Sequence, residues 1–179
     1  MNTSIKNISK VLATAALLAS AGFAHAGTAT ADVAVSAAIT AKCTISTTAV
    51  AFGDYDPITG NDVTTNGTVV VGCTKAAGSL WVGLGAGSNA VSGVRNMVGA
   101  TSGDKLAYSL VQPVDNTVGG ACPAFGAGTA WENTSGTALN LSSPTGYATR
   151  TYKVCGEIAK AQDKSVDTYT DTVVATINF

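Results

Sequence analysis

The residue types that most often carry out catalysis are scarce in this chain of 179 residues. Its one histidine, His25, lies inside a predicted export signal and is lost when that signal is cleaved. Without histidine, a Ser–His or Cys–His pair, in which the imidazole removes the nucleophile's proton, cannot form in the mature chain. We therefore expect a protein that is not an enzyme, with no cofactor and no small-molecule substrate.

Three aspartates lie close together in the sequence and could be taken for calcium ligands. Asp54, Asp56 and Asp62 supply carboxylate oxygens, but their spacing lacks the full series of oxygen ligands and the glycine of the common calcium loop. We favour a solvated turn closed by Pro57, because Asp and Pro are typical turn residues. The sequence therefore predicts no metal site here.

The chain has four cysteines, Cys43, Cys73, Cys122 and Cys155. An even number of cysteines in an exported chain favours disulfides. A zinc site would need histidine or a CxxC spacing, and the mature sequence has neither. Four cysteines allow three connectivities. We favour Cys43–Cys73 with Cys122–Cys155, because each pair would join two strand-like segments at a similar separation.

Two tryptophans could act as platforms on which a sugar ring stacks. Trp81 lies inside an apolar, strand-like segment, and we expect it to fill the core. Trp131 follows a loop rich in Gly and Ala and precedes Glu132 and Asn133. It is the residue on which a glycan- or protein-binding surface would depend.

The first 26 residues have the pattern of an export signal. Lys6 and Lys10 precede the apolar run 11–21, and Ala24-His25-Ala26 is a small-x-small cleavage site. The apolar run is shorter than the roughly 20 residues that a membrane-spanning helix needs. Cleavage removes two of the ten Lys and Arg and none of the eleven Asp and Glu, which leaves a net charge of −3. Nothing in this charge indicates binding to nucleic acid or to an anionic membrane surface, which would call for a basic patch.

The rest of the sequence predicts one all-β domain. It is rich in Gly, Thr, Ser, Val and Ala, and only 12% of the whole chain is charged, a composition typical of strands and turns. Short apolar segments separated by turn-rich stretches favour a β-sandwich. The polar stretch 157–165 is expected to be a loop. The predicted strands are 31–39, 43–52, 68–73, 80–84, 106–111, 148–155 and 169–179.

Two segments alternate apolar and polar residues with the period of two that a half-buried strand requires. The last segment runs to the end of the sequence, so no further strand closes the sheet beyond it. A chain of this kind is suited to joining copies of itself. The apolar positions are Ala29, Ala31, Val33, Val35, Ala37 and Ile39 in the first segment, and Tyr169, Val173, Ala175, Ile177 and Phe179 in the last.

Four motifs along the mature chain resemble those of one family. They are Phe52-Gly53-Asp54-Tyr55-Asp56-Pro57, Arg95-x-Met97 with Leu106-x-Tyr108-x-Leu110, Tyr152-x-Val154-x-Gly156-x-Ile158, and Tyr169-x-Asp171-Thr172-Val173 with Phe179. The family is the spore coat protein U domain, found in the pilins of archaic (Csu-type) chaperone–usher pili. The chain differs from the family pattern at Asp167, where the family often has glycine, and in the additional cysteines Cys122 and Cys155.

The resemblance implies an incomplete immunoglobulin-like β-sandwich, completed by a donor strand from a neighbouring subunit. It divides the chain into a signal peptide (1–26), an N-terminal donor strand (27–41) and a pilin domain (42–179). It also implies a disulfide, Cys43–Cys73, between the first two strands of the domain. The donor side chains would be Val33, Val35, Ala37 and Ile39. The acceptor groove would be lined by Tyr169, Val173, Ala175, Ile177 and Phe179, with the parity that faces it left open.

The function implied is that of a structural pilus subunit that polymerises head-to-tail through a periplasmic chaperone and an outer-membrane usher. Such a subunit is exported through the periplasm to the cell surface, binds copies of itself or other pilins, and supports attachment and biofilm formation. Two alternatives remain open. One is a secreted glycan- or protein-binding module that uses Trp131. The other is a spore-coat or matrix protein with the same domain, which would self-associate without an usher.

Overall fold

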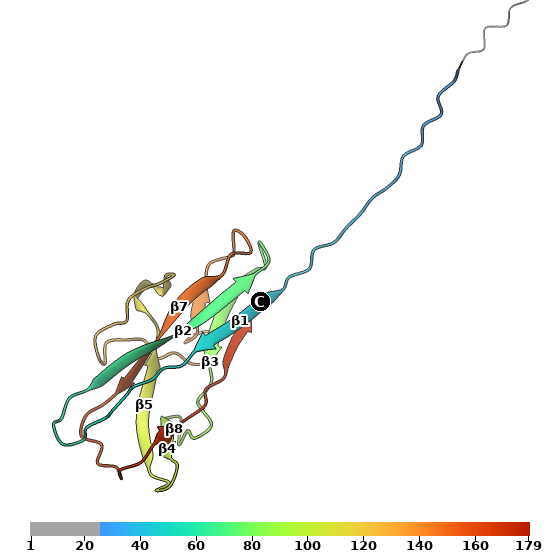
Figure 1. Ribbon diagram of the computed structural model, residues 1–179. Helices are drawn as coiled ribbons and strands as arrows, with labels where there is room; N and C mark the ends of the chain where they lie inside the picture. The colour runs from blue at the N-terminus through green and yellow to red at the C-terminus, as the bar shows by residue number, and fades with distance from the viewer. Residues whose placement is uncertain (1–25) are drawn as a thin grey trace, which may run out of the picture. The chain divides into compact units, whose positions relative to one another are not determined.

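The computed structural model describes residues 26–179, so the predicted signal peptide lies, except for Ala26, outside the described residues. None of the helical structure within residues 26–179 is long and apolar enough to cross a membrane. Residues 26–42 form no helix or strand, and every one of them is exposed. Residues 38–179 form a compact unit of their own (Figure 1).

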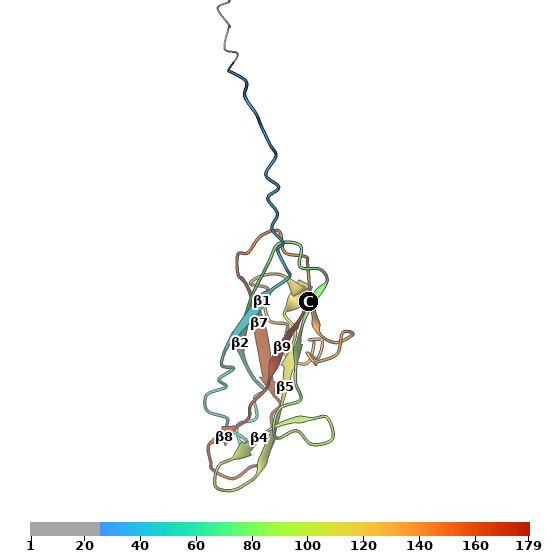
Figure 2. The same ribbon diagram turned by 90° about the vertical axis from the view of Figure 1, so that its right-hand side faces the viewer.

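The compact unit consists of two antiparallel sheets with loops between them (Figures 1 and 2). A single 3₁₀ turn, η1 (Val114–Asn116), lies in one of these loops. The larger sheet contains, in spatial order, β1 (Cys43–Thr48), β2 (Val63–Cys73), β7 (Arg150–Ile158), β5 (Lys105–Val111), β4 (Arg95–Gly99) and β8 (Tyr169–Thr170). The smaller sheet contains β6 (Leu139–Leu141), β3 (Leu80–Leu84) and β9 (Ala175–Asn178).

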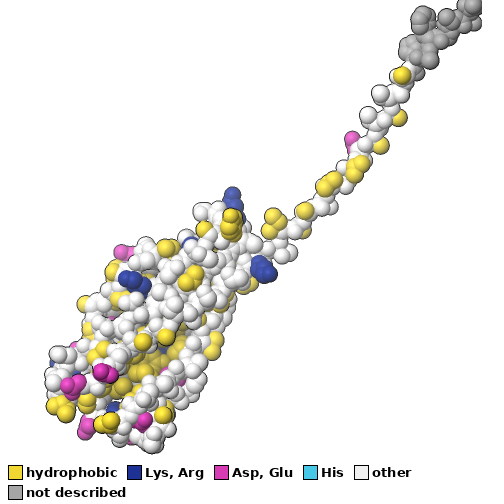
Figure 3. Space-filling view, in the orientation of Figure 1, with side chains coloured by type: hydrophobic (Ala, Val, Ile, Leu, Met, Phe, Trp, Pro, Cys, Tyr) yellow, Lys and Arg dark blue, Asp and Glu magenta, His cyan; other side chains and the backbone are white. Residues whose placement is uncertain are grey.

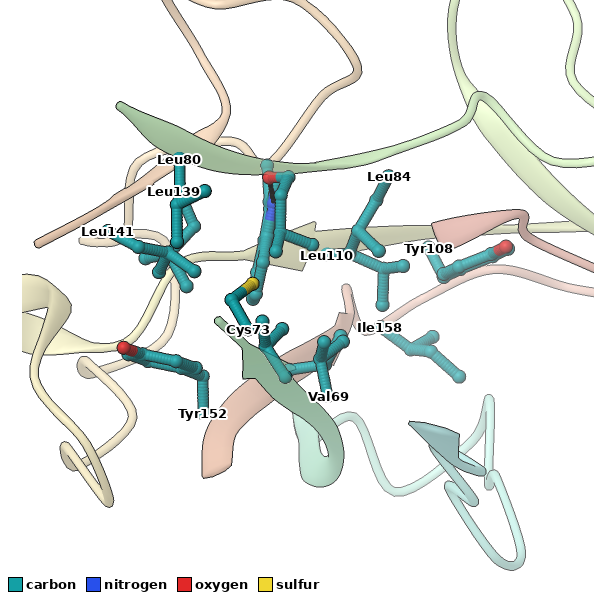
Figure 4. Packing of buried hydrophobic residues seen from close by; sticks show 14 of the residues in the cluster. Val69, Cys73, Leu80, Leu84, Tyr108, Leu110, Leu139, Leu141, Tyr152 and Ile158 are labelled. Carbon is teal, nitrogen blue, oxygen red and sulfur yellow. Dashed lines mark hydrogen bonds between the residues drawn. The ribbon is translucent and has the colours of Figure 1, made fainter. Parts of the chain in front are cut away.

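The core lies between the two sheets and follows the period-two pattern of their strands. Val69, Val71 and Cys73 alternate along β2 and are buried, whereas the residues between them are only half-buried. The smaller sheet contributes Val82 and Leu139, neither of which has any exposed surface. Figure 4 shows Val69 and Cys73 of β2 in the same packed cluster as Leu139.

The two tryptophans are placed the opposite way from the sequence prediction. Trp131 is 0% exposed, and its indole Nε1 donates a hydrogen bond of 2.7 Å to the carbonyl of Val82. Trp81 is only half-buried. Trp131 therefore fills the core, and it cannot serve as a platform for a sugar or a partner protein.

Both disulfides have the favoured connectivity. Cys43 and Cys73 are directly opposite each other in the ladder between β1 and β2, and they are bonded. Cys122, in the long loop after β5, is bonded to Cys155 on β7. Cys155 is itself buried, so the second bridge fastens the loop to the core.

Several strand boundaries differ from those predicted. The strand at 80–84 has the predicted bounds, but β2 begins at Val63 and so includes the stretch 63–67 before the predicted strand 68–73. The threonines and valine of this stretch favour a strand, and Gly67 makes room for it: a Cβ there would lie 2.6 Å from the carbonyl oxygen of Thr48. β4 and β6 were not predicted, 31–39 forms no strand, and 169–179 is divided into β8 and β9.

Candidate functional site: an open groove between the first and last strands

The first and last strands of the domain lie at the borders of their sheets. β1 is the outermost strand of the larger sheet, and β9 is the outermost strand of the smaller one. Among the described residues no strand pairs with the outer edge of either, so both edges present backbone N–H and C=O groups to solvent. Such edges readily accept another strand. β1 and β9 themselves lie close together. Beyond them, where the chain after β1 separates from the chain before β9, one more strand could be added.

An apolar groove runs along this position. Its two adjoining parts have volumes of about 370 Å³ and about 500 Å³. One wall is the chain after β1, between Thr47 and Pro57, and the other is the chain between Val166 and Ala175. Figure 3 shows hydrophobic side chains gathered in a hollow on this face of the domain. Both parts of the groove are lined by Val50, Phe52, Met97 and Tyr169.

The floor of the groove is the buried core itself. Val69, Leu110 and Val154 line it from the larger sheet, and Leu84 lines it from the smaller one. Around them lie hydrophobic residues that pack against the core but keep part of their surface exposed, among them Val50, Phe52, Met97, Tyr169, Val173 and Ala175. A half-exposed apolar layer of this kind leaves hydrophobic burial incomplete.

The wall after β1 depends on a glycine of the neighbouring sheet. A Cβ at Gly156 on β7 would lie 2.5 Å from the Val50 side chain and 2.8 Å from the Phe52 ring. Real Cβ atoms do not approach so closely, so only glycine lets the segment 49–52 lie directly on the sheet. The missing side chain at Gly156 therefore lets Val50 and Phe52 pack against β7.

Burial alternates along the closing segment as far as residue 174, whereas all four residues of β9 are partly buried and show no alternation. Tyr169, Asp171, Val173, Ala175 and Ile177 are partly buried, whereas residues 168, 170, 172 and 174 are exposed. Among the residues expected to line the groove, Tyr169, Val173 and Ala175 do so. Ile177 packs against the core outside it, and Phe179 is 56% exposed and lies outside it.

Asp171, between β8 and β9, breaks the apolar pattern of the closing strand and has a defined role there. Its carboxylate accepts a hydrogen bond of 2.6 Å from the hydroxyl of Tyr108, and two of 3.1 Å from the backbone and side-chain nitrogens of Asn89. Burial, together with this bond to Asp171, raises the pKa of the Tyr108 hydroxyl. The bend that divides β8 from β9 is thus held by side chains of two other segments.

Arg95, at the start of β4, anchors the structure beneath the groove. Its guanidinium donates hydrogen bonds to the carbonyls of Leu84 (3.0 Å), Gly85 (2.7 Å) and Trp131 (2.7 Å). Burial lowers the pKa of Arg95. The sequence motif contained Arg95, but nothing in the motif indicated that its partners would be backbone carbonyls.

The predicted donor segment has the composition needed to fill a groove of this kind. In residues 26–37 and the short stretch that follows, large apolar side chains are in contact with solvent. Val33 is 84% exposed, and Val35 and Ile39 are each 90% exposed. Covering such apolar surface with a partner lowers the free energy of the system.

The aspartates after β1 form a turn. The Asp56 carboxylate accepts hydrogen bonds from the backbone N–H groups of Ile58 (2.7 Å) and Thr59 (3.2 Å), and these lower its pKa. Asp62 accepts a bond of 2.8 Å from the backbone of Lys160. In the part of the chain that the structure describes, no three His, Cys, Asp or Glu side chains are grouped as metal ligands.

Comparisons with known proteins agree with this geometry. A model of the Spore Coat Protein U domain matches residues 29–176. Protein U of Myxococcus xanthus is 35% identical over 196 aligned residues, which cover 100% of both chains.

A solved structure is similar in fold. It is the crystal structure of the CsuC–CsuE chaperone–tip adhesion subunit pre-assembly complex from archaic chaperone–usher Csu pili of Acinetobacter baumannii. The TM-score is 0.50 at 17% identity, over 79% of this chain and 40% of the solved chain. The predicted fold class, an incomplete immunoglobulin-like β-sandwich, is confirmed.

Proposed function

Because this chain belongs to the Spore Coat Protein U domain family, we propose that it is a structural subunit of a surface fibre, polymerised head-to-tail by donor-strand exchange. Residues 27–41 of one copy are the donor strand, and the groove in residues 42–179 of the next copy is the acceptor. The observation that carries this proposal is the pairing of an open apolar groove with an exposed apolar segment of matching length.

The lengths of donor and acceptor agree closely. The apolar positions of the donor extend from Ala29 to Ile39, and the closing strand extends from Tyr169 to Phe179, so each covers eleven residues. At about 3.3 Å per residue, each is roughly 35 Å long. The large apolar side chains of the donor have odd numbers, and so do those of the closing strand, apart from Val174 and the interruption at Asp171. The groove itself runs beside residues 166–175 of this segment, and this is the part along which we propose that the donor lies.

Insertion of the donor into the groove is expected to release much more binding free energy than a contact between two exposed surfaces. Burial of Val33, Val35 and Ile39 contributes roughly 1.5–3 kcal/mol each, before the cost of ordering the segment. Each main-chain hydrogen bond adds roughly 0.5–1.5 kcal/mol. Ala37 fills less space than its neighbours. Because donor and acceptor surfaces differ, the contact repeats without closing into a ring.

Before strand exchange, the empty groove of each subunit must be covered. An exposed apolar groove promotes aggregation, so we propose that a periplasmic chaperone covers it until an outer-membrane usher brings the next subunit. The similar solved structure is itself a chaperone–subunit complex. In this assignment the fibre stands on the cell surface and supports attachment and biofilm formation.

A second candidate is a coat or matrix protein with the same self-association and no usher. The family description and the full-length similarity to Protein U favour it. Both candidates require strand exchange, and they differ in whether assembly depends on the usher.

The test compares the full-length chain with a variant that lacks residues 27–40, each co-expressed with chaperone and usher. Surface and periplasmic fractions are run on denaturing gels without boiling. We expect a ladder of resistant oligomers from the full-length chain alone. Equal ladders from both, or monomers from both, would show that this segment is not a donor. Expression without the usher then separates the pilus candidate from the coat candidate.

A matched pair of variants refines the test. Val33→Ser with Val35→Ser and Ile39→Ser keeps the length of the segment but removes the side chains that fill the groove. Thr30→Ser with Ser36→Ala changes the opposite parity. We expect the first set to lose the ladder and the second to keep it.

A further inference from the structure

One end of the domain is basic. It comprises residues 42–44, 72–79 and 142–151, which hydrogen bonds hold together: the Lys42 backbone N–H donates to Thr74 Oγ1 (3.1 Å), and that of Ala76 donates to the carbonyl of Pro144 (3.0 Å). We call it the basic end. These ranges contain no Asp or Glu, and their charged side chains are Lys42, Lys75 and Arg150.

The opposite end is acidic. It comprises residues 53–62, 100–105 and 159–168, which are also joined by hydrogen bonds, such as those from Tyr55 Oη to the carbonyl of Ala159 (3.0 Å) and from the Thr101 backbone to Asp167 (2.8 Å). We call it the acidic end. It carries six aspartates, Asp54, Asp56, Asp62, Asp104, Asp163 and Asp167, and three lysines, Lys105, Lys160 and Lys164.

Strand register shows that these are opposite ends of the same sheet. Cys43 pairs with Cys73, and Arg150 pairs with Val71, at the basic end. Ile158 pairs with Val63 at the acidic end. Figure 3 shows acidic side chains gathered at the end of the domain away from the start of β1.

Each end also exposes large apolar side chains. Tyr147 is almost fully exposed at the basic end, and its carbonyl lies close to Gly72, opposite Thr44. Ile58 and Val166 are almost fully exposed at the acidic end. Tyr147 thus accompanies the positive charges, and Ile58 and Val166 accompany the negative ones. The two ends are therefore opposite in charge, and each exposes apolar surface that the other could cover.

Donor-strand exchange, as proposed above, brings these two ends together. The closing strand runs from Tyr169 at the acidic end toward Phe179, and antiparallel pairing is the more stable arrangement for a strand added beside it. A donor in that direction has Ile39 at the acidic end of the acceptor. Only residues 40–42 separate Ile39 from Cys43 at the basic end of the donor's own domain. Four Cα–Cα steps span at most about 14 Å.

We propose that the basic end of each subunit docks on the acidic end of the subunit whose groove it fills. The occupant of the acidic end is therefore a second copy of this chain. Lys42 and Lys75 face Asp54 and Asp163, and Tyr147 packs near Ile58 and Val166. This contact is additional to the strand in the groove: it speeds encounter and sets the angle between successive domains.

The test reverses charge at one end or at both. Lys42→Glu with Lys75→Glu reverses the basic end, and Asp54→Lys with Asp163→Lys reverses the acidic end; no hydrogen bond is assigned to these four side chains in the structure. Chaperone complexes of each variant are mixed at low salt, and the growth of the unboiled ladder is timed. We expect either single-end variant to assemble about 3- to 10-fold more slowly than the wild type, and the variant reversed at both ends to recover.

Controls separate this contact from strand exchange. Lys153→Glu with Asp115→Lys reverses two charged residues outside the ranges of both ends, without changing the net charge, and should leave the rate unchanged. High salt should abolish the difference between variants. Single-end variants that form the ladder at the wild-type rate at low salt would overturn the docking of the two ends, while strand exchange stands. If the wild type itself forms no ladder, strand exchange fails, and this inference fails with it.

Discussion

The two sides of the sandwich differ in how completely the core is covered. On one side, Trp131 and Leu139 close the space between β3 and β5 and have no exposed surface. On the other, Val50, Phe52 and Val173 pack against the same core but remain partly exposed. The difference teaches that one side of the core is covered by the domain's own residues while the other leaves apolar surface uncovered. That uncovered surface is where we propose that the donor strand binds.

The strongest test of this comparison places a charge on each side. Leu139→Asp buries a carboxylate with no partner, so we expect the domain not to fold. Val173→Asp lies in the groove, which is open to water before a strand is added, so we expect a folded monomer that no longer forms the ladder. Circular dichroism and unboiled gels measure the two effects. A folded Leu139→Asp protein, or a Val173→Asp protein that polymerises, would contradict the division into two sides.

A smaller effect comes from removing one aromatic ring on each side. Trp131→Ala leaves a cavity and a Val82 carbonyl without its donor, and should lower the free energy of unfolding by about 3–5 kcal/mol. Phe52→Ala removes a ring that is already partly exposed and should cost the isolated subunit roughly half as much or less. Urea denaturation of the isolated, unpolymerised subunits measures both. Equal losses would mean that the two sides are equally well packed.

The bend in the closing strand provides a third test. Tyr108→Phe removes the hydroxyl that donates to Asp171 and should destabilise the domain by about 1–2 kcal/mol, because a partly buried carboxylate oxygen loses its donor. Leu106, a neighbour on β5, is buried but holds no such bond, so Leu106→Met should cost less than about 1.5 kcal/mol. Thermal unfolding compares the two. A Tyr108→Phe domain as stable as the wild type would show that the bond does not hold the bend.

The smallest expected effect is the loss of stability at low pH that Asp167, at the end of the groove, should cause. Backbone N–H groups of Ser102 and Thr101 lower the pKa of Asp167 from 3.8 to about 2. A lowered pKa in the folded state adds stability above about pH 4, and this stability is lost as the pH falls through 2. Asp167→Asn should therefore be less stable than the wild type at pH 7, with the difference shrinking between pH 4 and 2. Urea midpoints across that range measure it, and a difference independent of pH would refute it.

The sequence predicted best those features that arise from local pattern. The strand at 80–84 was predicted from a continuous apolar run and the last segment from its alternation, and neither pattern needs knowledge of distant residues. Contacts between residues far apart in the sequence could not be predicted from local pattern. Trp131 was misplaced because its local context, Gly and Ala, is typical of a surface loop, whereas its burial depends on the Val82 carbonyl, 49 residues away.

The division of the closing strand had a signal that could have been used. Asp171 stands where an apolar residue would continue the odd parity, and its partners Tyr108 and Asn89 explain why the strand bends there. The short β6 had only Leu139 and Leu141 to indicate it, too few residues for a period to be recognised. Gly156 was quoted as a motif residue, but its role under Val50 and Phe52 required coordinates.

The position of the Cys43–Cys73 bridge has a mechanical consequence for a fibre assembled in this way. Tension between subunits would enter each domain through Lys42, directly before the bridged residue at the start of β1. Because Cys43 is bonded to the last residue of β2, the load passes at once to a strand paired on both sides, and β1 cannot be peeled away from it. The hydrogen bonds along the inserted donor are then loaded together in shear. In every subunit the Cys43–Cys73 bridge lies at the point where the force enters the domain.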